Sequence, residues 1–274
     1  MSAESQYLAF HGVRVHFRML EPEVALKHRV LLLCSPMIST FHWRKLVPEL
    51  SQLGCLLVLV DLPGFGLSDC SFGVPRDSRM RASIIWGILD EIDRRTGAPM
   101  SMWHLISHGT GCRTALSMFQ QCPDSVCSQV YISPELAQMD AQRFANGPGR
   151  WFDRNILDAA GFKRMAETLS GYPMDDYVLE KMRMPLLRPG AKDIFLHVLR
   201  EETPQSDSVC GFCPVMAIWG GRDKLMDPRE IRTVERLLPE AEKHVLKSAG
   251  HFPMETHSRA LRDYLRGWFR YLET

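Results

Sequence analysis

The stretch LLVLVDLPGFGLS, residues 56–68, joins an unbroken apolar run to a turn rich in glycine. A continuous apolar run of this length, bounded by turn residues, is typical of a strand buried on both faces of a parallel sheet. Gly64 and Gly66 do not indicate a phosphate-binding loop, because the helix and the lysine that such a loop needs do not follow them. The stretch therefore predicts an interior strand of a parallel sheet and a tight turn after it.

Similar runs recur along the chain and alternate with amphipathic helical patterns. Eight strands are expected, and the first two form a hairpin: Tyr7–Phe10, Val13–Leu20, Val30–Leu33, Leu56–Val60, Trp103–Ser107, Val130–Ser133, Val215–Gly220 and His244–Lys247. Helices are expected at Trp43–Leu53, Arg79–Arg95, Gly111–Gln121 and Leu261–Leu272. This alternation predicts an α/β protein with an eight-stranded, mostly parallel sheet that helices flank on both faces.

One segment, residues 135–209, has no buried-strand pattern and is rich in aromatic residues and methionine. We interpret it as a helical cap, or lid, inserted after the sixth strand, with residues 1–134 and 210–274 forming the core. An ordinary extra helical layer is the alternative, but the core is complete without this segment. The aromatic side chains expected to line a pocket under the cap are Trp151, Phe152 and Phe162.

Four stretches resemble, in their order and spacing, the sequence pattern of the α/β-hydrolases that carry an inserted cap: Asp61–Ser68, His108–Gly111, Trp219–Asp223 and Ala249–Pro253. In that family the first stretch follows the fourth strand. The other three carry the nucleophile elbow, the catalytic acid and the catalytic histidine. The resemblance covers nearly the whole chain and implies the α/β-hydrolase fold with its cap after the sixth strand.

The nucleophile of this family stands on a sharp strand-to-helix turn with the pattern G-x-S-x-G. The segment here reads SHGTG, residues 107–111, so the resemblance puts Gly109, which has no side chain, at the serine position. Ser107 falls where the family needs a small residue for close packing, and its hydroxyl is expected to face away. Thr110 is expected to open the following helix and to cap it. Either hydroxyl could become the nucleophile only if the turn shifted.

The loop after the third strand departs from the family pattern as well. Relatives have His-Gly there, and a backbone N–H of this loop contributes to the oxyanion hole. This chain has Cys34 and Ser35 instead, and the following Pro36 has no N–H to donate. The Thr110 N–H is the second donor that the resemblance implies, and it is retained. Two altered features at one site disfavour simple acyl-enzyme hydrolysis.

Asp223 and His251 stand where the resemblance puts the acid and the histidine of the family. In such a pair the carboxylate orients the imidazole and stabilises its charged form. An imidazole with a pKa of about 6.5 can then accept or donate a proton near neutral pH. We interpret the pair as functional rather than as a relic kept for stability, because both loops keep their full pattern. Glu135, where some relatives place the acid, is expected to be the solvated start of the cap.

Other candidates have weaker signals. His108 is expected to be structural, as this residue usually is in the family, and His42 is expected at the edge of the pocket. Cys34 is a candidate for a thiol that lines the pocket, but a nucleophilic role needs a lowered pKa and a nearby base, which nothing local supplies. The C-x-x-C spacing of Cys210 and Cys213 suits a redox pair or half of a zinc site, but it lacks a second ligand pair. We expect two ordinary thiols there, no metal site and no cofactor.

Composition bounds the remaining function classes. The chain has 274 residues, 45% of them hydrophobic and 24% charged, and a formal net charge of +1 without a basic block. Nucleic acid and an anionic bilayer are therefore disfavoured as partners. The start of the chain does not read as a signal peptide, and no apolar run approaches the roughly 20 residues that span a membrane. We expect a cytoplasmic protein that binds a small, largely apolar molecule, in an oligomeric state that the sequence leaves open.

Three functions stay open. The first is an enzyme without an elbow nucleophile, in which His251 and Asp223 act as general acid or base on a small carbonyl or ester compound. Its reaction is elimination, decarboxylation, cyclisation, cofactor-free oxygenation or water-mediated hydrolysis. The second is a serine ester or C–C hydrolase whose serine was replaced by Gly109, although one replacement does not explain the altered loop at Pro36. The third is a non-catalytic protein that binds a ligand or a partner. The fold does not decide among them.

Overall fold

The computed structural model describes residues 4–71, 73–74, 77–97, 101–137, 150, 154–156, 158–201 and 213–274. Eight strands form one sheet in the order β1-β2-β4-β3-β5-β6-β7-β8. Their bounds are β1 Gln6–Phe10, β2 Val13–Leu20, β3 His28–Leu33, β4 Cys55–Val60, β5 Trp103–His108, β6 Val126–Ile132, β7 Val215–Gly220 and β8 Glu242–Leu246. β2 pairs antiparallel with β1 and with β4, and all the other pairings are parallel. The predicted α/β class and mostly parallel eight-stranded sheet are confirmed.

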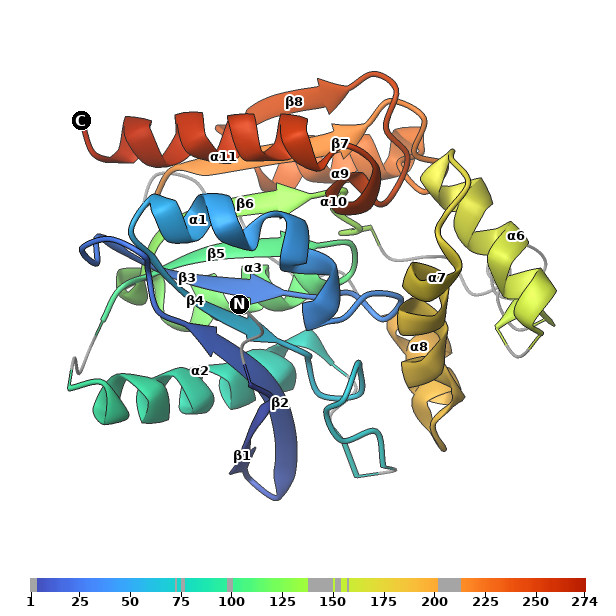
Figure 1. The fold of residues 1–274 in the computed structure, drawn as a ribbon, viewed down its shortest axis with the longest axis horizontal. Helices are drawn as coiled ribbons and strands as arrows, with labels where there is room; N and C mark the ends of the chain where they lie inside the picture. Colours follow the sequence, from blue (N-terminus) through green and yellow to red (C-terminus); the bar gives the residue numbers. More distant parts are fainter. Residues whose placement is uncertain are drawn as a thin grey trace.

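Helices cover both faces of this sheet (Figure 1). On one face lie α2 (Ser78–Arg95) and α3 (Gly111–Gln121), and on the other lie α1 (Val47–Gln52) and α11 (Ser258–Leu272). Successive residues of β3 alternate between two buried clusters, Leu31 with the α2–α3 side and Leu32 with the α1–α11 side. Both faces are apolar for this reason, and the strand reads as an unbroken apolar run.

The region of the first predicted helix, 43–53, is divided in the structure. A 3-10 helix, η1 (Thr40–Lys45), comes first, and α1 follows it with Pro48 in its first turn. Proline lacks the N–H that would bond back into the preceding turn, so it is tolerated at a helix start and not in a helix interior. Two further helices, α9 (Pro228–Leu237) and α10 (Pro253–Thr256), are not indicated by the hydropathy pattern. Each of them also starts at a proline.

The turn after β4 is held by the Asp61 carboxylate, which lies buried at its centre. It accepts hydrogen bonds from the backbone N–H of Thr40 at 2.8 Å and of Leu67 at 2.9 Å, and it bonds Nδ1 of His16 at 2.8 Å. Gly66 has a φ of +51°, and a Cβ there would collide with this carboxyl group. The fold-deciding stretch is therefore a structural corner, in which the glycine leaves room for a buried acid.

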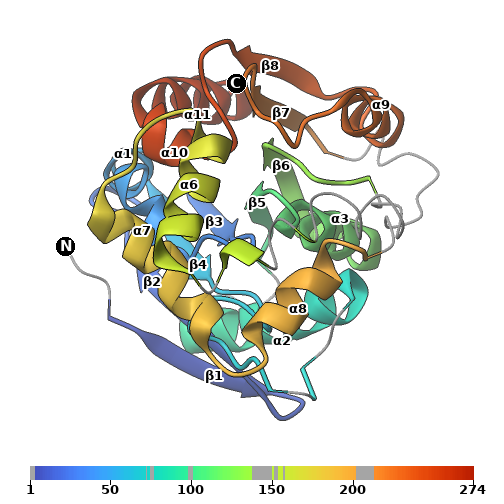
Figure 2. The same ribbon diagram turned by 90° about the vertical axis from the view of Figure 1, so that its right-hand side faces the viewer.

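The residues between β6 and β7 are called the β6–β7 segment below. Its described part contains α6 (Ala159–Ser170), α7 (Asp176–Arg183), a 3-10 helix η3 (Met184–Leu187) and α8 (Ala191–Val198). In Figures 1 and 2 these helices lie together beyond the carboxyl ends of the central strands. That edge of a parallel sheet is where ligands bind in open α/β folds.

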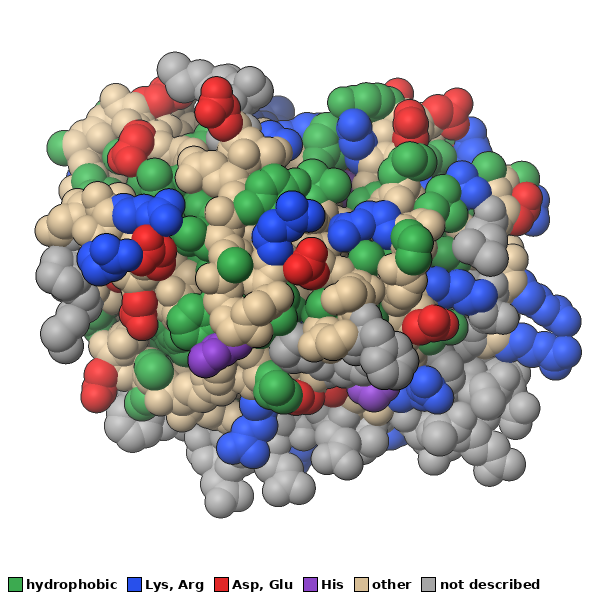
Figure 3. Space-filling model, turned by 90° about the horizontal axis from the view of Figure 1, so that it is seen from below, with side chains coloured by type: hydrophobic (Ala, Val, Ile, Leu, Met, Phe, Trp, Pro, Cys, Tyr) green, Lys and Arg blue, Asp and Glu red, His purple; other side chains and the backbone are tan. Residues whose placement is uncertain are grey.

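The helices and one face of the molecule bear on a membrane span and on a charged binding face. No helix in the described ranges is both long enough and apolar enough to cross a membrane. On the face shown in Figure 3, Lys and Arg side chains lie among Asp and Glu side chains over most of the area. Interspersed charges of both signs produce no large field of one sign on that face.

Candidate active site

Gly109 lies in the sharp turn between β5 and α3. Its φ is +56°, in the left-handed region that favours glycine. Its N–H donates to the Ile132 carbonyl at 3.1 Å, and its own carbonyl accepts from the Glu135 N–H at 3.2 Å. A Cβ on Gly109 would lie 3.6 Å from Nε2 of His251. The turn is thus fastened to the end of β6 and presents bare backbone to the imidazole.

The two hydroxyls that flank Gly109 point in different directions. Ser107 donates to Sγ of Cys112 at 3.3 Å inside the core, so its hydroxyl faces away from the site, as expected. The Thr110 hydroxyl does not cap α3, which corrects the prediction. The reason is that Thr110 has helical backbone angles, φ −66° and ψ −18°, whereas a capping side chain needs an extended backbone. Its Oγ1 is buried without a hydrogen-bond partner among the described residues.

The imidazole of His251 is held by a carboxylate on each side. Its Nδ1 lies 2.9 Å from Oδ2 of Asp223, and its Nε2 lies 3.0 Å from Oε1 of Glu135. The structure thus brings together the two residues that sequence reasoning paired, and adds a third. The expectation that Glu135 is a solvated start of the cap is wrong, since its side chain is only 14% exposed. The backbone bonds to Gly109 and Arg113 fix this residue so that its carboxylate faces the ring.

The charges of this triad depend on one another. Burial alone would lower the pKa of His251, but the carboxylates of Asp223 and Glu135 outweigh it and raise that pKa to about 10. Burial likewise opposes ionisation of Asp223, and the charge and hydrogen bond of His251 bring the pKa of this carboxyl below its usual value. His251 is therefore an imidazolium at neutral pH that donates from both nitrogens. With both carboxylates ionised, the triad carries one excess negative charge.

His108 holds two loops of the site together but does not line the cavity. Its Nε2 lies 2.8 Å from the carbonyl of His251, and its Nδ1 lies 3.0 Å from Oγ of Ser35. Burial and the neighbouring charge of His251 lower the pKa of His108 to about 3, so the ring is neutral. A carbonyl only accepts, so Nε2 carries the proton and Nδ1 accepts from the Ser35 hydroxyl. Through these two hydrogen bonds His108 connects the loop after β3, at Ser35, to the loop that carries His251. This agrees with the structural role expected of His108.

A cavity of about 20 Å³ adjoins the triad. A single water needs roughly 10–15 Å³, so the cavity holds one molecule of that size. Its polar lining comes from Ser35, Thr110, Glu135 and His251, and its apolar lining from Pro36, Met37, Phe195, Leu199 and Leu225. Phe195 of α8 and Leu199, which directly follows α8, thus close it from the side of the β6–β7 segment.

Several residues predicted at the pocket lie elsewhere. Cys34 is fully buried and accepts from Nε1 of Trp43 at 3.1 Å, and burial raises its pKa well above the ordinary value, so it stays a thiol. His42 is buried as well, its Nδ1 accepts from the Ser39 N–H at 2.9 Å, and burial lowers its pKa to about 4. Neither side chain lines the cavity. Cys34, directly after β3, and His42, in η1, both point into the core.

The predicted cap pocket is described only at one of its three aromatic residues. Phe162 is 1% exposed and lines a groove between α6 and α7 instead of the cavity at His251. Its helix is amphipathic, and Phe162 belongs to the same buried apolar cluster as Leu32 of β3. The end of this helix reaches the site through its backbone, because the Leu169 carbonyl accepts from the His251 N–H at 2.8 Å. Trp151 and Phe152 lie outside the described residues, as does Cys210 of the C-x-x-C pair.

Arg113 is a site-supporting residue that sequence reasoning missed. It is 2% exposed and lies in the first turn of α3. Its guanidinium donates to four carbonyls, those of Glu135 and Ala137 at 2.8 Å and those of Val198 and Glu201 at 2.9 Å. These carbonyls belong to both described ends of the β6–β7 segment. Arg113 thus joins the helix that begins at the Gly109 turn to the backbone of Glu135.

Two buried glutamates complete this support. Glu230 of α9 accepts from the backbone N–H of Leu136, and of Ala137 at 3.0 Å, and burial raises its pKa to about 7. Glu201 pairs with Arg81 of α2. No hydropathy pattern reveals such groups, because a buried charged residue looks like a surface residue in the sequence. Among the described residues no cluster of three or more His, Cys, Asp or Glu side chains could hold a metal ion.

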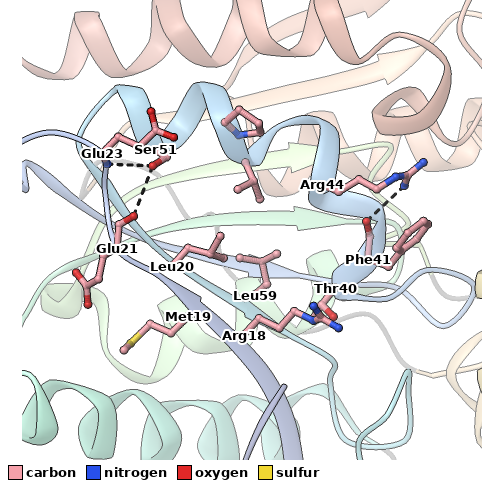
Figure 4. A pocket seen from close by; sticks show the side chains of 12 residues that line it. Arg18, Met19, Leu20, Glu21, Glu23, Thr40, Phe41, Arg44, Ser51 and Leu59 are labelled. Atoms are coloured by element: carbon pink, nitrogen blue, oxygen red, sulfur yellow. Dashed lines mark hydrogen bonds between the residues drawn. The ribbon is translucent and has the colours of Figure 1, made fainter. Parts of the chain in front are cut away.

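A cavity of about 610 Å³ lies away from these residues, between β2, η1 and α1 (Figure 4). Leu20 and Leu59 form its floor, and Arg18 and Arg44 lie toward one end. The Arg44 guanidinium is already engaged by Glu255 through two hydrogen bonds. None of its described lining residues is shared with the cavity at His251.

Comparisons with known proteins agree with this architecture. A model of the alpha/beta hydrolase family matches residues 31–264. A 2-hydroxy-6-oxononadienedioate/2-hydroxy-6-oxononatrienedioate hydrolase of Cupriavidus pinatubonensis is 22% identical over 233 residues, which cover 80% of this chain and 78% of that protein. A meta-cleavage product hydrolase from Pseudomonas fluorescens IP01 has a TM-score of 0.78 at 16% identity, with 97% of each chain covered. A thermophilic esterase from Thermogutta terrifontis has a TM-score of 0.76 at 19% identity, covering 99% of this chain and all of the other.

Proposed function

Because the chain belongs to the alpha/beta hydrolase family, we propose that it is an enzyme of this fold that works without an elbow nucleophile. In this proposal Gly109 occupies the nucleophile position and His251 moves a proton on the substrate, oriented by Asp223. Residues 135–209 act as the cap over a core formed by residues 1–134 and 210–274. The substrate is a small, largely apolar carbonyl or ester compound.

One observation supports this proposal above the others. The nitrogen of His251 that would face a serine faces the bare backbone of Gly109 and the carboxylate of Glu135 instead. The Ser107 hydroxyl is turned into the core, and the Thr110 hydroxyl has no hydrogen-bond partner among the described residues. An acyl-enzyme therefore has no candidate oxygen at the turn, whereas a charged imidazole that can donate and recover a proton is present.

The charge of the triad argues for a neutral substrate. The Glu135 carboxylate and the His251 imidazolium line a cavity whose described walls contain no Lys or Arg side chain. The second carboxylate, Asp223, bonds the other nitrogen of the ring. The Cupriavidus relative is named for a dienedioate, which is a dicarboxylate. A dianion would meet like charge in a buried site, and charges of the same sign at close range cost several kcal/mol, on the order of 4 at 4 Å. We therefore do not assign that substrate to this chain.

The protonated state of His251 sets the order of events. Since its pKa is raised to about 10, the ring enters the reaction as a proton donor. A substrate oxygen that takes the place of Glu135 at Nε2 would receive that proton as negative charge develops on it. Removing one carboxylate from the ring also lowers the imidazole pKa, which makes the transfer easier. General acid catalysis of this kind contributes roughly a hundredfold to ten-thousandfold in rate.

The test is turnover by the wild type and two histidine variants on a panel of neutral carbonyl compounds and esters. We expect turnover of at least one compound, a loss of about a hundredfold or more in His251→Gln, and no loss in His11→Gln, whose ring is exposed. A fluorophosphonate should leave the wild type unlabelled. Equal turnover in the wild type and in His251→Gln would refute the proposal.

A second candidate, a non-catalytic protein that binds a ligand away from the triad or a partner, is favoured by the size of the cavity. About 20 Å³ beside the triad does not admit a substrate unless Phe195 or Leu199 moves. Calorimetry on the same panel separates the two candidates. Binding without turnover, unchanged in His251→Gln, supports the second candidate, and binding with turnover supports the first.

A further inference from the structure

We propose that Glu135 is the general base of this site and activates a water molecule held beside the Thr110 hydroxyl. The reaction is then hydrolysis of a small neutral ester by direct attack of water, without an acyl-enzyme. This inference rests on the proposed function and selects one reaction from those it allows. It assigns the catalytic oxygen to a solvent molecule rather than to the chain.

The first support is the cavity, which has the size and the lining of a water site. Its volume of about 20 Å³ exceeds the roughly 10–15 Å³ that one water needs, and a buried water takes two to four polar partners. Ser35, Thr110, Glu135 and His251 all line it. Thr110 is 2% exposed, and its hydroxyl has no partner among the described residues. A buried unsatisfied hydroxyl costs about 1–3 kcal/mol, and a water in this cavity would remove that cost.

The second support is the way in which Glu135 is held. Its N–H bonds the carbonyl of Gly109 at 3.2 Å, and its carbonyl accepts from Nε of Arg113 at 2.8 Å. Both bonds fasten it to the turn that carries Thr110. Oε1 is engaged by Nε2 of His251, and Oε2 has no hydrogen bond to another described residue. A second oxygen on a fixed carboxylate, beside a water-sized cavity, can accept a proton.

The third support is the absence of a side chain at Gly109. A Cβ there would lie 3.0 Å from Cβ of Ser35 and 3.6 Å from Nε2 of His251. The first distance is tighter than ordinary packing, so bare backbone fits beside the ring whereas a side chain would be strained. Without a side chain at Gly109, no oxygen of the turn competes with a water for the substrate carbonyl.

The proposed reaction closes its proton cycle within the triad. Glu135 removes a proton from water as the water oxygen bonds to the ester carbon and the carbonyl electron pair moves onto oxygen. The carbonyl then re-forms, the bond from carbon to the alkoxy oxygen breaks, and the leaving alkoxide takes the proton of His251 Nε2. The products are an acid and an alcohol. When the alcohol has left Nε2, protonated Glu135 and neutral His251 return to their contact of 3.0 Å. A turn of the carboxyl group then brings the acquired proton from Oε2 to Nε2 and restores the resting state.

The sharpest experiment is a single turnover of p-nitrophenyl acetate in heavy-oxygen water, with the enzyme in excess, followed by mass spectrometry of acetate and of the Glu135 peptide. We expect the heavy oxygen in acetate and none in the peptide. Heavy oxygen in Glu135 would overturn the proposal, because it would make this carboxylate a nucleophile rather than a base.

Variants supply the second arm. Glu135→Gln should lower kcat on the ester by about a hundredfold or more, while Glu180→Gln, an exposed glutamate of α7, should not change it. Formate should restore part of the activity of Glu135→Ala, which a purely structural loss would not allow. Thr110→Val should lower kcat, and Thr110→Ser should retain it. Full activity of Glu135→Gln would overturn the proposal.

The outcomes separate this inference from the proposed function. If the wild type acts on another carbonyl compound through His251 but hydrolyses no ester, the water mechanism is refuted and the proposed function stands. If His251→Gln is inactive on esters while Glu135→Gln is fully active, the result is the same. If no compound of either kind is turned over, both are refuted.

Discussion

Glu135 Oε1 lies 3.0 Å from His251 Nε2, on the opposite side of the ring from Asp223. In a serine triad the hydroxyl of the elbow residue bonds that nitrogen, and the histidine must be neutral to accept its proton. Here a carboxylate from the end of β6 bonds it instead. Because of this contact His251 already carries a proton on Nε2 and acts as an acid rather than as a base. Gly109, which has no side chain, lies beside it.

A serine restored at the turn should remain unreactive by itself. We expect that Gly109→Ser is not labelled by a fluorophosphonate, because Glu135 keeps His251 protonated and no base activates the new hydroxyl. The double variant Gly109→Ser with Glu135→Gln should be labelled. The measurement is covalent mass gain on the intact protein.

The unfolding free energy of Gly109→Ser provides the control for that experiment. A φ of +56° and a Cβ contact of 3.0 Å with Ser35 make the substitution strained, at a cost of about 1–3 kcal/mol. If Gly109→Ser alone is labelled as readily as the double variant, the chain is a serine hydrolase that merely lost its nucleophile.

Arg113 should be important for stability as well as for the site. Arg113→Met removes the donor from four carbonyls, and we expect a loss of about 3 kcal/mol or more in unfolding free energy. Arg113→Lys should lose less, because it keeps three donors. Urea unfolding measures both. Arg236→Met, an exposed position on α9, is the matched control, and an equally small effect at Arg113 would contradict the assignment.

Phe195 should limit access to the cavity. Phe195→Ala removes an apolar wall of the cavity, and we expect kcat/KM on a small neutral ester to rise by about tenfold, which equals roughly 1.4 kcal/mol. The buried ring also stabilises α8, so its removal should cost about 3–5 kcal/mol in unfolding free energy. Steady-state kinetics at low temperature measures the first effect. Unchanged or lower kcat/KM in the folded variant would show that α8 does not restrict the site.

Stability should fall with alkaline pH. The pKa of His251 rises from 6.5 to about 10 on folding, so its contribution is fully present below pH 6.5 and is lost as pH rises through 10. We expect the unfolding free energy to fall more steeply between these limits in the wild type than in Glu135→Gln, where one carboxylate is removed from the ring. Equal slopes in urea titrations across this range would contradict the charged state of His251.

The sheet could be predicted from the sequence because its central strands are buried on both faces. All six residues of β4, Cys55–Val60, are buried, which produces an unbroken apolar run in the sequence. The hairpin β1–β2 and the parallel pairing of the later strands were predicted from the alternation of strand and helix patterns, whereas the order of the strands was not. By contrast, α9 is mostly polar on its exposed side and begins at Pro228, so its hydropathy resembles that of a loop.

The site residues could be predicted from the sequence only where they belong to a motif. Asp223 and His251 belong to loops with recognisable patterns, and they meet at 2.9 Å. Glu135 stands where some relatives place the acid, but no motif surrounds it, and a polar residue after a strand is usually exposed. Its position is fixed by a hydrogen bond to the Gly109 carbonyl and one from Arg113, both remote from His251 in sequence. The aromatic residue Phe162 misled for a different reason, because an amphipathic helix buries its aromatic face whether or not that face lines the site.

The most direct measurement is an NMR titration of the ring nitrogens of His251 in the wild type and in Glu135→Gln. We expect both nitrogens to carry protons at pH 8 in the wild type, with an apparent pKa near 10, and a clearly lower pKa in the variant. A ring that is neutral at pH 8 and titrates near 6.5 in both proteins would contradict the account of a charged histidine held between two carboxylates.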